Sequence, residues 1–450
     1  MTNGLKSPCR DSLEMQGLVA EIAVLQAVQP IGRIDEILGN TLIVSGLSSV
    51  AGLGDQVQIR NRKGARVSGE ILQMNSRLIT VMPDEILEGA AIGDEVVLLG
   101  PTIIAPDNGW IGHVIDPSGR AIDGSFLMRG VKERSLRETP PKATERRGFG
   151  GRLETGMAAF NTMLPIVRGQ RVGLFSGSGV GKSTLLARLA CGMQADIVVI
   201  ALIGERGREV REFVDNVLGP EGMAKSVVVA ATSDQSPLVR RRCALTAMSV
   251  AEHFRDQGLH VLLLADSVTR FAEAHREVAL ASGEQASLRG FPPSTSHTIM
   301  ALCERAGPGA GSAGDITAIF SVLVAGSDMD EPIADILRGV LDGHVVLDRQ
   351  IAERGRFPAI DFLRSVSRSL PEAASAEENT LITAARHLLG TYDRSEMMIQ
   401  AGLYAAGSDP AVDEAIRVYP LLEGFLSEDE AGNCSDSFTR LRAAVSPENV

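Results

Sequence analysis

The sequence is poor in aromatic residues and cysteines, and it contains no long apolar run. Aromatic residues make up 4% of its 450 residues, with one tryptophan among them, so the core must be mainly aliphatic. The five cysteines are scattered and form no CxxC pair, which argues against a disulfide framework or a zinc site. No apolar run approaches the ~18 residues of a membrane-spanning helix, and the N-terminus lacks a signal-peptide core. We expect any membrane association to be peripheral or through a partner.

The sequence also lacks a basic excess. Its formal net charge is −12, with 56 acidic and 44 basic residues. Nucleic-acid-binding proteins usually carry a basic surface, so we expect no nucleic acid among the partners.

The seven histidines show no HExxH or similar metal-binding spacing, and each is more simply explained as structural. The arginine run at 240–242 falls on a predicted helix, where a solvated face is the simplest interpretation.

Short apolar runs and turn residues divide the first 150 residues. Apolar spacing within residues 18–25 allows a short amphipathic helix. Residues 1–25 are therefore either a terminus that docks on the next domain or a partner-binding segment. Residues 26–100 have strand-like runs separated by Gly and Asn, which predict a small β-barrel. These runs lie at residues 41–45, 55–59, 78–81 and 94–99. Residues 101–150 are rich in Pro and Gly and carry basic stretches, so we interpret them as a linker into the core.

The pattern changes in the remainder of the chain. Residues 151–370 contain continuous apolar runs that alternate with helical segments, a pattern typical of a mostly parallel α/β sheet covered on both faces. The runs lie at residues 172–175, 197–203, 227–230, 261–264 and 316–324, and the helical segments include 183–192 and 237–257. Residues 371–450 are rich in Ala, Leu and Glu and predict a helical C-terminal domain. Its two helical stretches, near 375–405 and 411–426, flank a Gly-Ser-Asp-Pro turn.

The strongest motif is a glycine-rich loop between an apolar run and a helical segment. Residues 171–184 read RVGLFSGSGVGKST, which is the strand, loop and helix context that a Walker A motif requires. Glycines allow the backbone to approach phosphate closely, and the N–H groups at the helix start face the anion. Lys182 would reach the β- and γ-phosphates, and the Ser183 hydroxyl would ligate Mg²⁺. The predicted nucleotide-binding residues of the loop are Ser176, Gly177, Ser178, Gly179, Val180, Gly181, Lys182, Ser183 and Thr184.

One position departs from the Walker A pattern. The pattern calls for glycine at position 176, and this chain has Ser176. Because serine is small and the position lies where the strand ends, we expect the substitution to be tolerated.

Two carboxylates follow apolar runs next to this loop. Asp266 ends the run at 261–265, where it could hold Mg²⁺ or its water; a helix N-cap is the alternative interpretation. Glu205 follows the run at 197–203, and strand ends in doubly wound sheets point at one crevice. We predict that Glu205 orients and polarises the attacking water, kept ionised by Mg²⁺ and a nearby arginine. Glu209 fits better as a helix-start carboxylate.

These motifs together resemble the rotary ATPase superfamily. Residues 177–184, 204–209 (GERGRE) and 262–271 (LLLADSVTRF) carry the resemblance. Residues 356–361 (RFPAID), 365–368 (SVSR) and 401–410 (AGLYAAGSDP) resemble its type III secretion branch, most closely the flagellar protein-export ATPases. The family implies a RecA-like P-loop domain with an N-terminal β-barrel and a C-terminal helical domain, which agrees with the independent domain prediction.

The resemblance also implies roles for single residues and for partners. Arg368, in the SVSR motif, would be an arginine finger acting on a neighbouring subunit's γ-phosphate, and Arg206 would lie beside the γ-phosphate. Phe357 matches an aromatic residue that stacks on adenine. The implied assembly is a homohexamer with nucleotide at its subunit interfaces. Its implied partners are a regulatory dimer at the N-terminal segment, a coiled-coil stalk protein at the C-terminal domain, export substrates and chaperones, and a membrane export gate at which the ring is peripheral.

The competing functions share the same P-loop core. The expected function is ATP hydrolysis that energises flagellar protein export, releasing and unfolding export substrates. A virulence-type III secretion ATPase or the catalytic subunit of a rotary ATP synthase are alternatives, although no DELSEEDK-like stretch is present. A vacuolar-type subunit would need a long insertion before the P-loop domain. A non-catalytic nucleotide-binding subunit usually lacks a glutamate at position 205, and an RNA translocase would need a basic surface.

Overall fold

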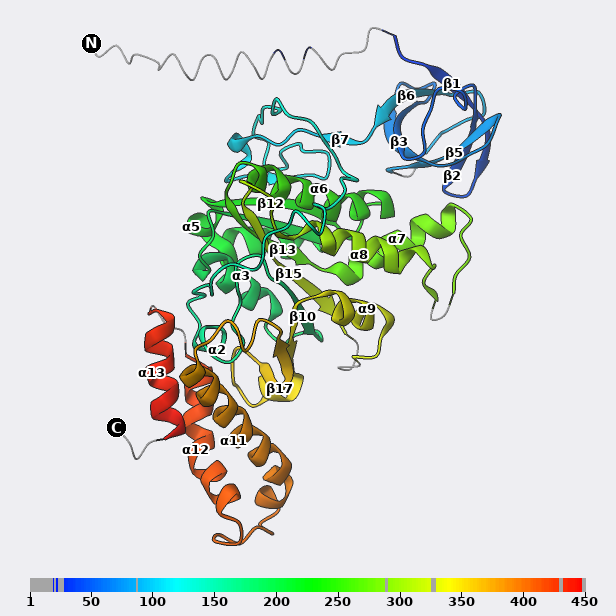
Figure 1. The fold of residues 1–450 in the computed structure, drawn as a ribbon. Helices are drawn as coiled ribbons and strands as arrows, with labels where there is room; N and C mark the ends of the chain where they lie inside the picture. The colour runs from blue at the N-terminus through cyan, green and yellow to red at the C-terminus, as the bar shows by residue number, and fades with distance from the viewer. Residues whose placement is uncertain are drawn as a thin grey trace, which may run out of the picture.

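The structure is a computed structural model, and it describes residues 19, 22, 28–85, 88–287, 290–324, 329–428 and 432–446. Apart from Val19 and Ile22, the predicted partner-binding segment at residues 1–25 lies outside the described residues. The chain forms an N-terminal barrel, a central sheet domain and a C-terminal group of helices, which lie in this order along the molecule (Figure 1). The predicted fold class is thereby confirmed.

Six antiparallel strands close the N-terminal barrel in the order β1-β2-β5-β4-β3-β6. Their bounds are β1 Ile31–Leu38, β2 Thr41–Ser45, β3 Asp55–Arg60, β4 Arg66–Met74, β5 Leu78–Pro83 and β6 Glu95–Pro101. Alternating residues point inward and form a wholly aliphatic core that includes Val44, Val57 and Val81. Strands β2, β3, β5 and β6 lie where the apolar runs predicted strands. Closure leaves no free sheet edge in the barrel.

The segment after the barrel is more than a connection. It contains β7 Ile103–Ile104, a 3₁₀ turn Asn108–Trp110, β8 Val114–Ile115 and β9 Arg134–Ser135. Strand β8 adds to the edge of the central sheet beside β12, and Trp110 is buried with its indole N–H donating to Met128 O. This segment therefore belongs to the packed structure of the central domain, a role that its Pro/Gly-rich composition does not reveal.

The central sheet has the strand order β17-β16-β10-β15-β13-β11-β12-β8, with β14 paired on β15. Its main strands run parallel, and β17 pairs antiparallel with β16. The bounds are β10 Arg171–Ser176, β11 Ile197–Glu205, β12 Ser226–Thr232, β13 His260–Asp266, β14 Gly307–Pro308, β15 Asp315–Leu323, β16 Gly343–Leu347 and β17 Ile360–Ser367. Strands β10, β11 and β13 are buried almost throughout, as continuous apolar runs predict.

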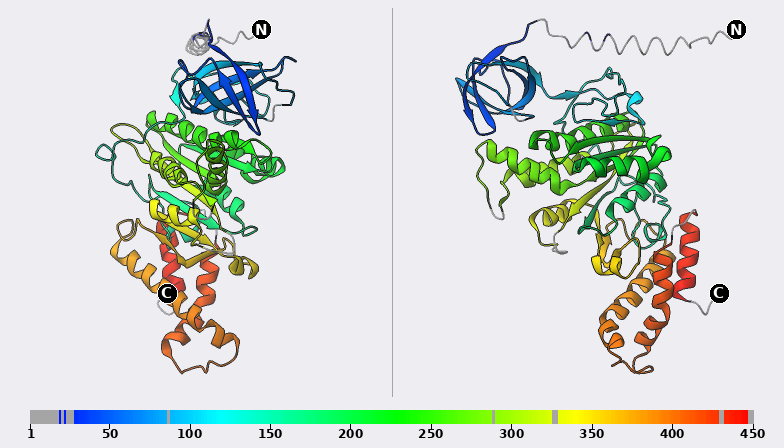
Figure 2. Two further views of the ribbon diagram at one scale, coloured as in Figure 1. Left: turned by 90° about the vertical axis from the view of Figure 1, so that its right-hand side faces the viewer. Right: turned by 180° about the vertical axis from the view of Figure 1, so that it is seen from behind.

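Helices cover both faces of the sheet (Figure 2). One core cluster joins the face beneath α3 to the C-terminal helices, and the other packs the opposite face against α6, α7 and α8. The bounds are α2 Ala158–Asn161, α3 Lys182–Gly192, α4 Gly207–Glu212, a π-helix Phe213–Leu218, α5 Gly219–Met223, α6 Pro237–Asp256, α7 Val268–Ala281, α8 Ser294–Arg305, α9 Pro332–Val340 and α10 Arg349–Glu353.

Three helices form the C-terminal part, at the end of the molecule opposite the barrel (Figure 1). They are α11 Ala376–Gln400, α12 Pro410–Leu426 and α13 Cys434–Val445. Helix α11 begins with a capping box between Ser375 and Glu378, and α12 begins at Pro410 with Asp409 as its N-cap. Helices α11 and α12 occupy the two predicted helical stretches, whereas α13 had no separate prediction.

The arginine run on α6 is not a solvated face. Arg242 is 4% exposed and forms a two-pronged hydrogen bond with Asp84, which follows β5. Arg241 donates to Glu70 of β4, and Arg137 donates to the same carboxylate. The solvated interpretation was wrong because the partner carboxylates lie in the barrel, more than 150 residues earlier in the sequence. This ion-pair network fixes the barrel to the central domain.

Candidate active site

The glycine-rich loop joins the buried strand β10 to helix α3 at the carboxyl edge of the sheet. Gly179 and Gly181 have φ values of 78° and 83°, a backbone conformation that favours glycine. Helix α3 begins at Lys182, and Gly181 at its N-cap offers no side chain to the first N–H groups. Those N–H groups are consequently available to an anionic ligand. Ser183 and Thr184 are exposed in the first turn of α3, on the open side of the loop.

Ser176 ends β10 and is fully buried. It pairs with Leu323 of β15 on one side and Leu347 of β16 on the other, so its backbone is ordinary strand. Its hydroxyl has no hydrogen-bond partner among the described residues. The fold accommodates serine at this Walker A position without distorting the strand, but it leaves a buried hydroxyl unsatisfied.

Lys182 and Asp266 meet beneath the loop. Lys182 Nζ forms an ion pair and hydrogen bond with Asp266 Oδ1, and both side chains are largely buried. Ser321 of β15 donates its hydroxyl to the same Asp266 oxygen at 2.6 Å. Asp266 is thus held from two sides at the end of β13, pointing toward the P-loop lysine. Ser321 was missed by sequence reasoning because no motif marks it.

Glu205 lies at the end of β11, half-buried near the Asp266 carboxylate. Burial in the crevice and the nearby Asp266 charge raise the pKa of Glu205 to about 7, although Lys182 and Arg270 oppose the shift. The Arg270 charge acts in the direction that we expected of a nearby arginine, and burial outweighs it. A carboxyl with a pKa near 7 suits proton transfer at neutral pH.

The arginine whose charge opposes the rise in the pKa of Glu205 is Arg270, a residue to which the sequence analysis gave no role. Arg206 is mostly exposed and donates to Glu209 Oε1 at 2.6 Å. Arg270, on α7, packs its Cδ against Gly204, where an added Cβ would lie 3.2 Å away. The Nε of Arg270 is buried without a hydrogen-bond partner among the described residues. Arg270 therefore supplies positive charge inside the crevice.

Phe357 and Arg368 lie apart from each other. The Phe357 ring faces the phosphate loop, because a Cβ added to Gly181 would lie 3.4 Å from ring carbons Cδ1 and Cε1. The ring is 47% exposed and therefore has an open face. Arg368 follows β17; it is exposed, and its guanidinium donates to Arg338 O at 3.0 Å. Its place at the sheet's far edge suits action on a neighbouring molecule.

The donor set fits a magnesium ion that arrives with nucleotide. The Ser183 hydroxyl follows Lys182 in the first turn of α3, and the Asp266 carboxylate is paired with Lys182, so the site offers two hard oxygen ligands. No group of three or more His, Cys, Asp or Glu side chains suited to a metal occurs within the described ranges. A protein that binds MgATP needs no such cage, since one or two protein oxygens and the phosphates suffice.

Fold and site together define a P-loop nucleotide-binding protein with a barrel before the catalytic sheet and helices after it. Residues 156–367 match the nucleotide-binding domain of the ATP synthase alpha/beta family, and residues 374–443 match the T3SS EscN ATPase C-terminal domain. Among the helices that the structure describes, none has the length and apolar character to cross a bilayer.

Curated relatives extend over nearly the whole chain. A "Flagellum-specific ATP synthase" of Caulobacter vibrioides is 42% identical over 436 residues, covering 95% of this chain and 98% of the relative. The proteins of the same name from Bacillus subtilis and Salmonella typhimurium are 39% and 40% identical, and they cover 97% and 94% of this chain. The alignments cover 100% and 95% of those two proteins.

Solved structures agree with these relatives. The assembled ATPase EscN of the enteropathogenic E. coli type III secretion system superposes with a TM-score of 0.85 at 36% identity, covering 92% of this chain and 100% of EscN. EscN in complex with its central stalk EscO superposes with a TM-score of 0.83 at 37% identity, with the same coverage. The chain therefore belongs to the family of flagellum-specific ATP synthases, the type III export branch of the ATP synthase alpha/beta family, and it is an ATPase.

Proposed function

We propose that this chain hydrolyses ATP at the interfaces of a homohexameric ring and thereby energises flagellar protein export. The observation that carries the proposal is the convergence of Lys182, Asp266 and Glu205, which follow or end β10, β13 and β11 at one edge of the sheet, next to a helix start without a side-chain cap. This arrangement supports roles for Lys182 as the cation at the phosphates, Asp266 as an oxygen ligand of Mg²⁺ and Glu205 as the group that acts on the attacking water. The export branch is favoured over an ATP synthase subunit by the match of the C-terminal helices to the EscN family.

In this proposal each residue has a distinct role. The loop 176–184 binds the phosphates through backbone N–H groups, and Lys182 neutralises charge on the β- and γ-phosphates. Glu205 orients the attacking water and accepts its proton, which its pKa of about 7 in this structure allows. Phe357 offers its exposed ring face to adenine. Arg206, at the crevice rim, would have to leave Glu209 to reach the γ-phosphate.

Ser183 and Asp266 would hold Mg²⁺, with Ser321 fixing the orientation of Asp266. The ion, when bound, supplies charge that offsets the negative charge of the phosphates. Arg270 is placed to add positive charge from the protein side of the crevice.

Arg368 acts on a neighbouring subunit in this proposal. Its exposed guanidinium follows β17, whereas Lys182 starts the helix after β10, two strands away in the sheet order. A catalytic arginine supplied across an interface makes turnover depend on assembly. The assembled state named for EscN supports a ring for this chain as well.

The partners follow from the same comparison. The tip between α11 and α12 exposes Met397, Met398 and Leu403, an apolar surface far from the barrel (Figure 1). EscN is named in complex with a central stalk, EscO. We assign this tip to a coiled-coil stalk protein. The N-terminal segment is assigned to a regulatory dimer, and the ring to export substrates and chaperones at a membrane export gate, where it is peripheral.

The domain assignment accompanies this proposal. We assign residues 1–25 to a partner-binding segment, 26–100 to the barrel, 101–150 to the connection into the core, 151–370 to the ATPase domain and 371–450 to the helical domain. The flagellar system is preferred to a virulence system because a curated relative named flagellar is 42% identical over 95% of this chain, whereas EscN is 36–37% identical over 92% of it.

The test is the specific ATPase activity of the purified chain as a function of its concentration. Catalysis across interfaces predicts that activity per chain rises steeply with concentration and then saturates. An activity per chain that does not change with concentration would contradict the ring. Stimulation by RNA, measured in parallel, would favour a translocase instead. The membrane complex that co-purifies with the chain distinguishes flagellar from virulence export.

A further inference from the structure

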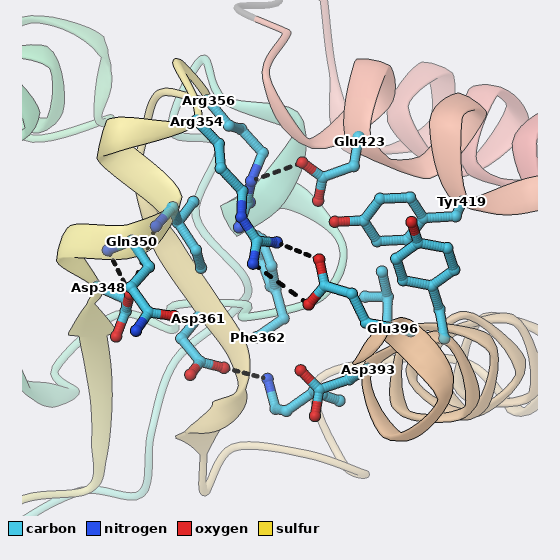
Figure 3. A pocket seen from close by; sticks show the side chains of 14 residues that line it. Asp348, Gln350, Arg354, Arg356, Asp361, Phe362, Asp393, Glu396, Tyr419 and Glu423 are labelled. Atoms are coloured by element: carbon cyan, nitrogen blue, oxygen red, sulfur yellow. Dashed lines mark hydrogen bonds and ion pairs between the residues drawn. The ribbon is translucent and has the colours of Figure 1, made fainter. Parts of the chain in front are cut away.

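The turn between α10 and β17 contacts both the phosphate loop and the C-terminal helices. Phe357 lies against Gly181 of the loop. Arg356, the residue before it, lines a cavity between β17 and helices α11 and α12 (Figure 3). Two consecutive residues therefore connect the predicted adenine contact to the helical domain.

Arg356 is held by groups from two domains. It is 8% exposed, and its Nε lies 3.1 Å from Glu423 Oε2 on α12. Its Nη2 donates to Ile360 O at 2.7 Å, and its guanidinium carbon lies 5.4 Å from the ring centroid of Phe362. Glu423 supplies the one carboxylate paired with Arg356 in the described structure (Figure 3). The position of the Arg356 side chain therefore depends on a residue of the helical domain.

Burial makes this ion pair sensitive to the loss of either partner. Burial lowers the pKa of Arg356 and raises the pKa of Glu423; the Arg356 side chain is 7% exposed and that of Glu423 28%, so the arginine charge depends most on its partner. Removing one partner of a buried pair leaves an uncompensated charge, which is strongly destabilising. The element that we expect to respond is the short turn that carries Phe357, which lies between the ends of α10 and β17 and includes Gly355.

We propose that Glu423 is a positioning residue for nucleotide binding, acting through Arg356 on Phe357. The inference rests on the proposed function, in which Phe357 packs against adenine. With Glu423 in place, Arg356 keeps the turn in the conformation that holds the Phe357 ring against the phosphate loop. The coupling is reciprocal, so bound nucleotide stabilises the position of α12. The position of α12 in the helical domain therefore depends on whether nucleotide is bound.

A second ion pair in the same cavity provides a matched control. Arg354 and Glu396 join the same turn to α11, with Nη1 2.8 Å from Oε1 (Figure 3). The Arg354 side chain is 48% exposed, so solvent can replace this pair. Glu396→Gln removes the same charge from the same domain junction without leaving a buried arginine unpaired. It separates general loosening of the junction from the specific effect of Glu423.

The experiment compares wild type, Glu423→Gln, Glu423→Asp and Glu396→Gln. Binding of a fluorescent ADP analogue is measured at protein concentrations too low for ring assembly, where the loop and Phe357 belong to one chain. ATPase kinetics are measured at saturating assembly. We expect Glu423→Gln to raise both Kd and KM about tenfold while kcat stays within about twofold, a size typical of coupling between sites. Glu423→Asp should recover part of the affinity, and Glu396→Gln should stay within about twofold of wild type.

Three outcomes would overturn the inference. One is a Kd of Glu423→Gln within about twofold of wild type, and another is an equal loss in Glu396→Gln. The third is a fall in kcat at unchanged KM. Should Glu423→Gln fail to fold, the double variant Arg356→Gln/Glu423→Gln removes both charges together and must still show weakened binding. A wild-type chain that binds no nucleotide would instead contradict the proposed function itself.

Discussion

Ser321 donates a 2.6 Å hydrogen bond to Asp266 Oδ1, the oxygen that also accepts a hydrogen bond from Lys182. Ser321 and Asp266 lie on neighbouring strands, β15 and β13, and Ser321 is fully buried. A carboxylate fixed by two donors presents one orientation to the phosphate loop. Partners that orient a metal ligand are typically worth about 10–100-fold in metal affinity or activity. Ser321 is thus a positioning residue for the proposed magnesium ligand.

Ser321→Ala should raise the Mg²⁺ concentration for half-maximal ATPase activity about tenfold, with less effect on kcat at saturating Mg²⁺. The matched control is Ser226→Ala, which removes an equally buried serine hydroxyl that donates to Gly222 O at 2.6 Å, away from the P-loop. An unchanged Mg²⁺ dependence in Ser321→Ala would show that Lys182 alone orients Asp266.

Arg368→Ala should nearly abolish turnover while ATP still binds. An arginine finger accelerates phosphoryl transfer about 10³–10⁵-fold, equivalent to roughly 4–7 kcal/mol of barrier. Single-turnover kinetics and ATP binding are the two measurements. Near-normal kcat in the variant alone would contradict the assignment.

Mixing variants tests whether the arginine acts between chains. Lys182→Ala destroys the phosphate site but keeps Arg368, whereas Arg368→Ala keeps the phosphate site. A mixture of the two should recover part of the wild-type activity, because some interfaces combine an intact loop with an intact arginine. A mixture no more active than either variant would place the arginine's action within its own chain.

Ser176→Ala should stabilise the chain. The buried Ser176 hydroxyl has no partner among the described residues, and an unsatisfied buried polar group costs about 1–3 kcal/mol. Removing it should raise the thermal unfolding midpoint by about 2–4 °C, the shift that 1 kcal/mol produces in a domain of this size. Ser226→Ala, which breaks a satisfied hydrogen bond, should shift the midpoint in the opposite direction. A lowered midpoint for Ser176→Ala would mean that the hydroxyl is satisfied in solution.

The features that could be predicted from the sequence are those that depend only on consecutive residues. The P-loop needs only a strand, a glycine-rich turn and a helix in succession, and residues 171–184 supply all three. Strands β11, β13 and β15 are buried on both faces, so each appears as an apolar run. Strands β4 and β17 have mixed burial patterns and therefore left no such run.

What could not be predicted depends on contacts between distant segments. Ser321 meets Asp266 only because β13 and β15 are neighbours in a particular register. Arg242 is buried because the barrel supplies Asp84, 158 residues away. Arg270 of α7 acts on the pKa of Glu205 because its side chain packs against Gly204. In each case the sequence contains the charged or polar group but not the partner that decides its role.

His260 gives the chain an acid-sensitive core. It begins β13, is 4% exposed, and its Nε2 is 2.8 Å from Thr317 Oγ1 of β15. Burial and the Arg168 charge lower the pKa of His260 from 6.5 to about 4, although Asp196 and Asp315 oppose the shift. Between pH 6.5 and 4, His260 is therefore mostly protonated in the unfolded chain and mostly neutral in the folded chain. Stability falls with falling pH across this window.

The expected size of the effect follows from the two pKa values. Lowering the pH from 7 to 5 should cost about 2 kcal/mol through His260 alone. In His260→Gln this contribution is absent, so its free energy of unfolding should fall less over the same interval by about that amount. Urea unfolding followed by the fluorescence of Trp110, the single tryptophan, is the measurement, since Trp110 is buried beside the central sheet. Equal pH dependence in wild type and variant would mean that His260 is protonated with its usual pKa in the folded chain.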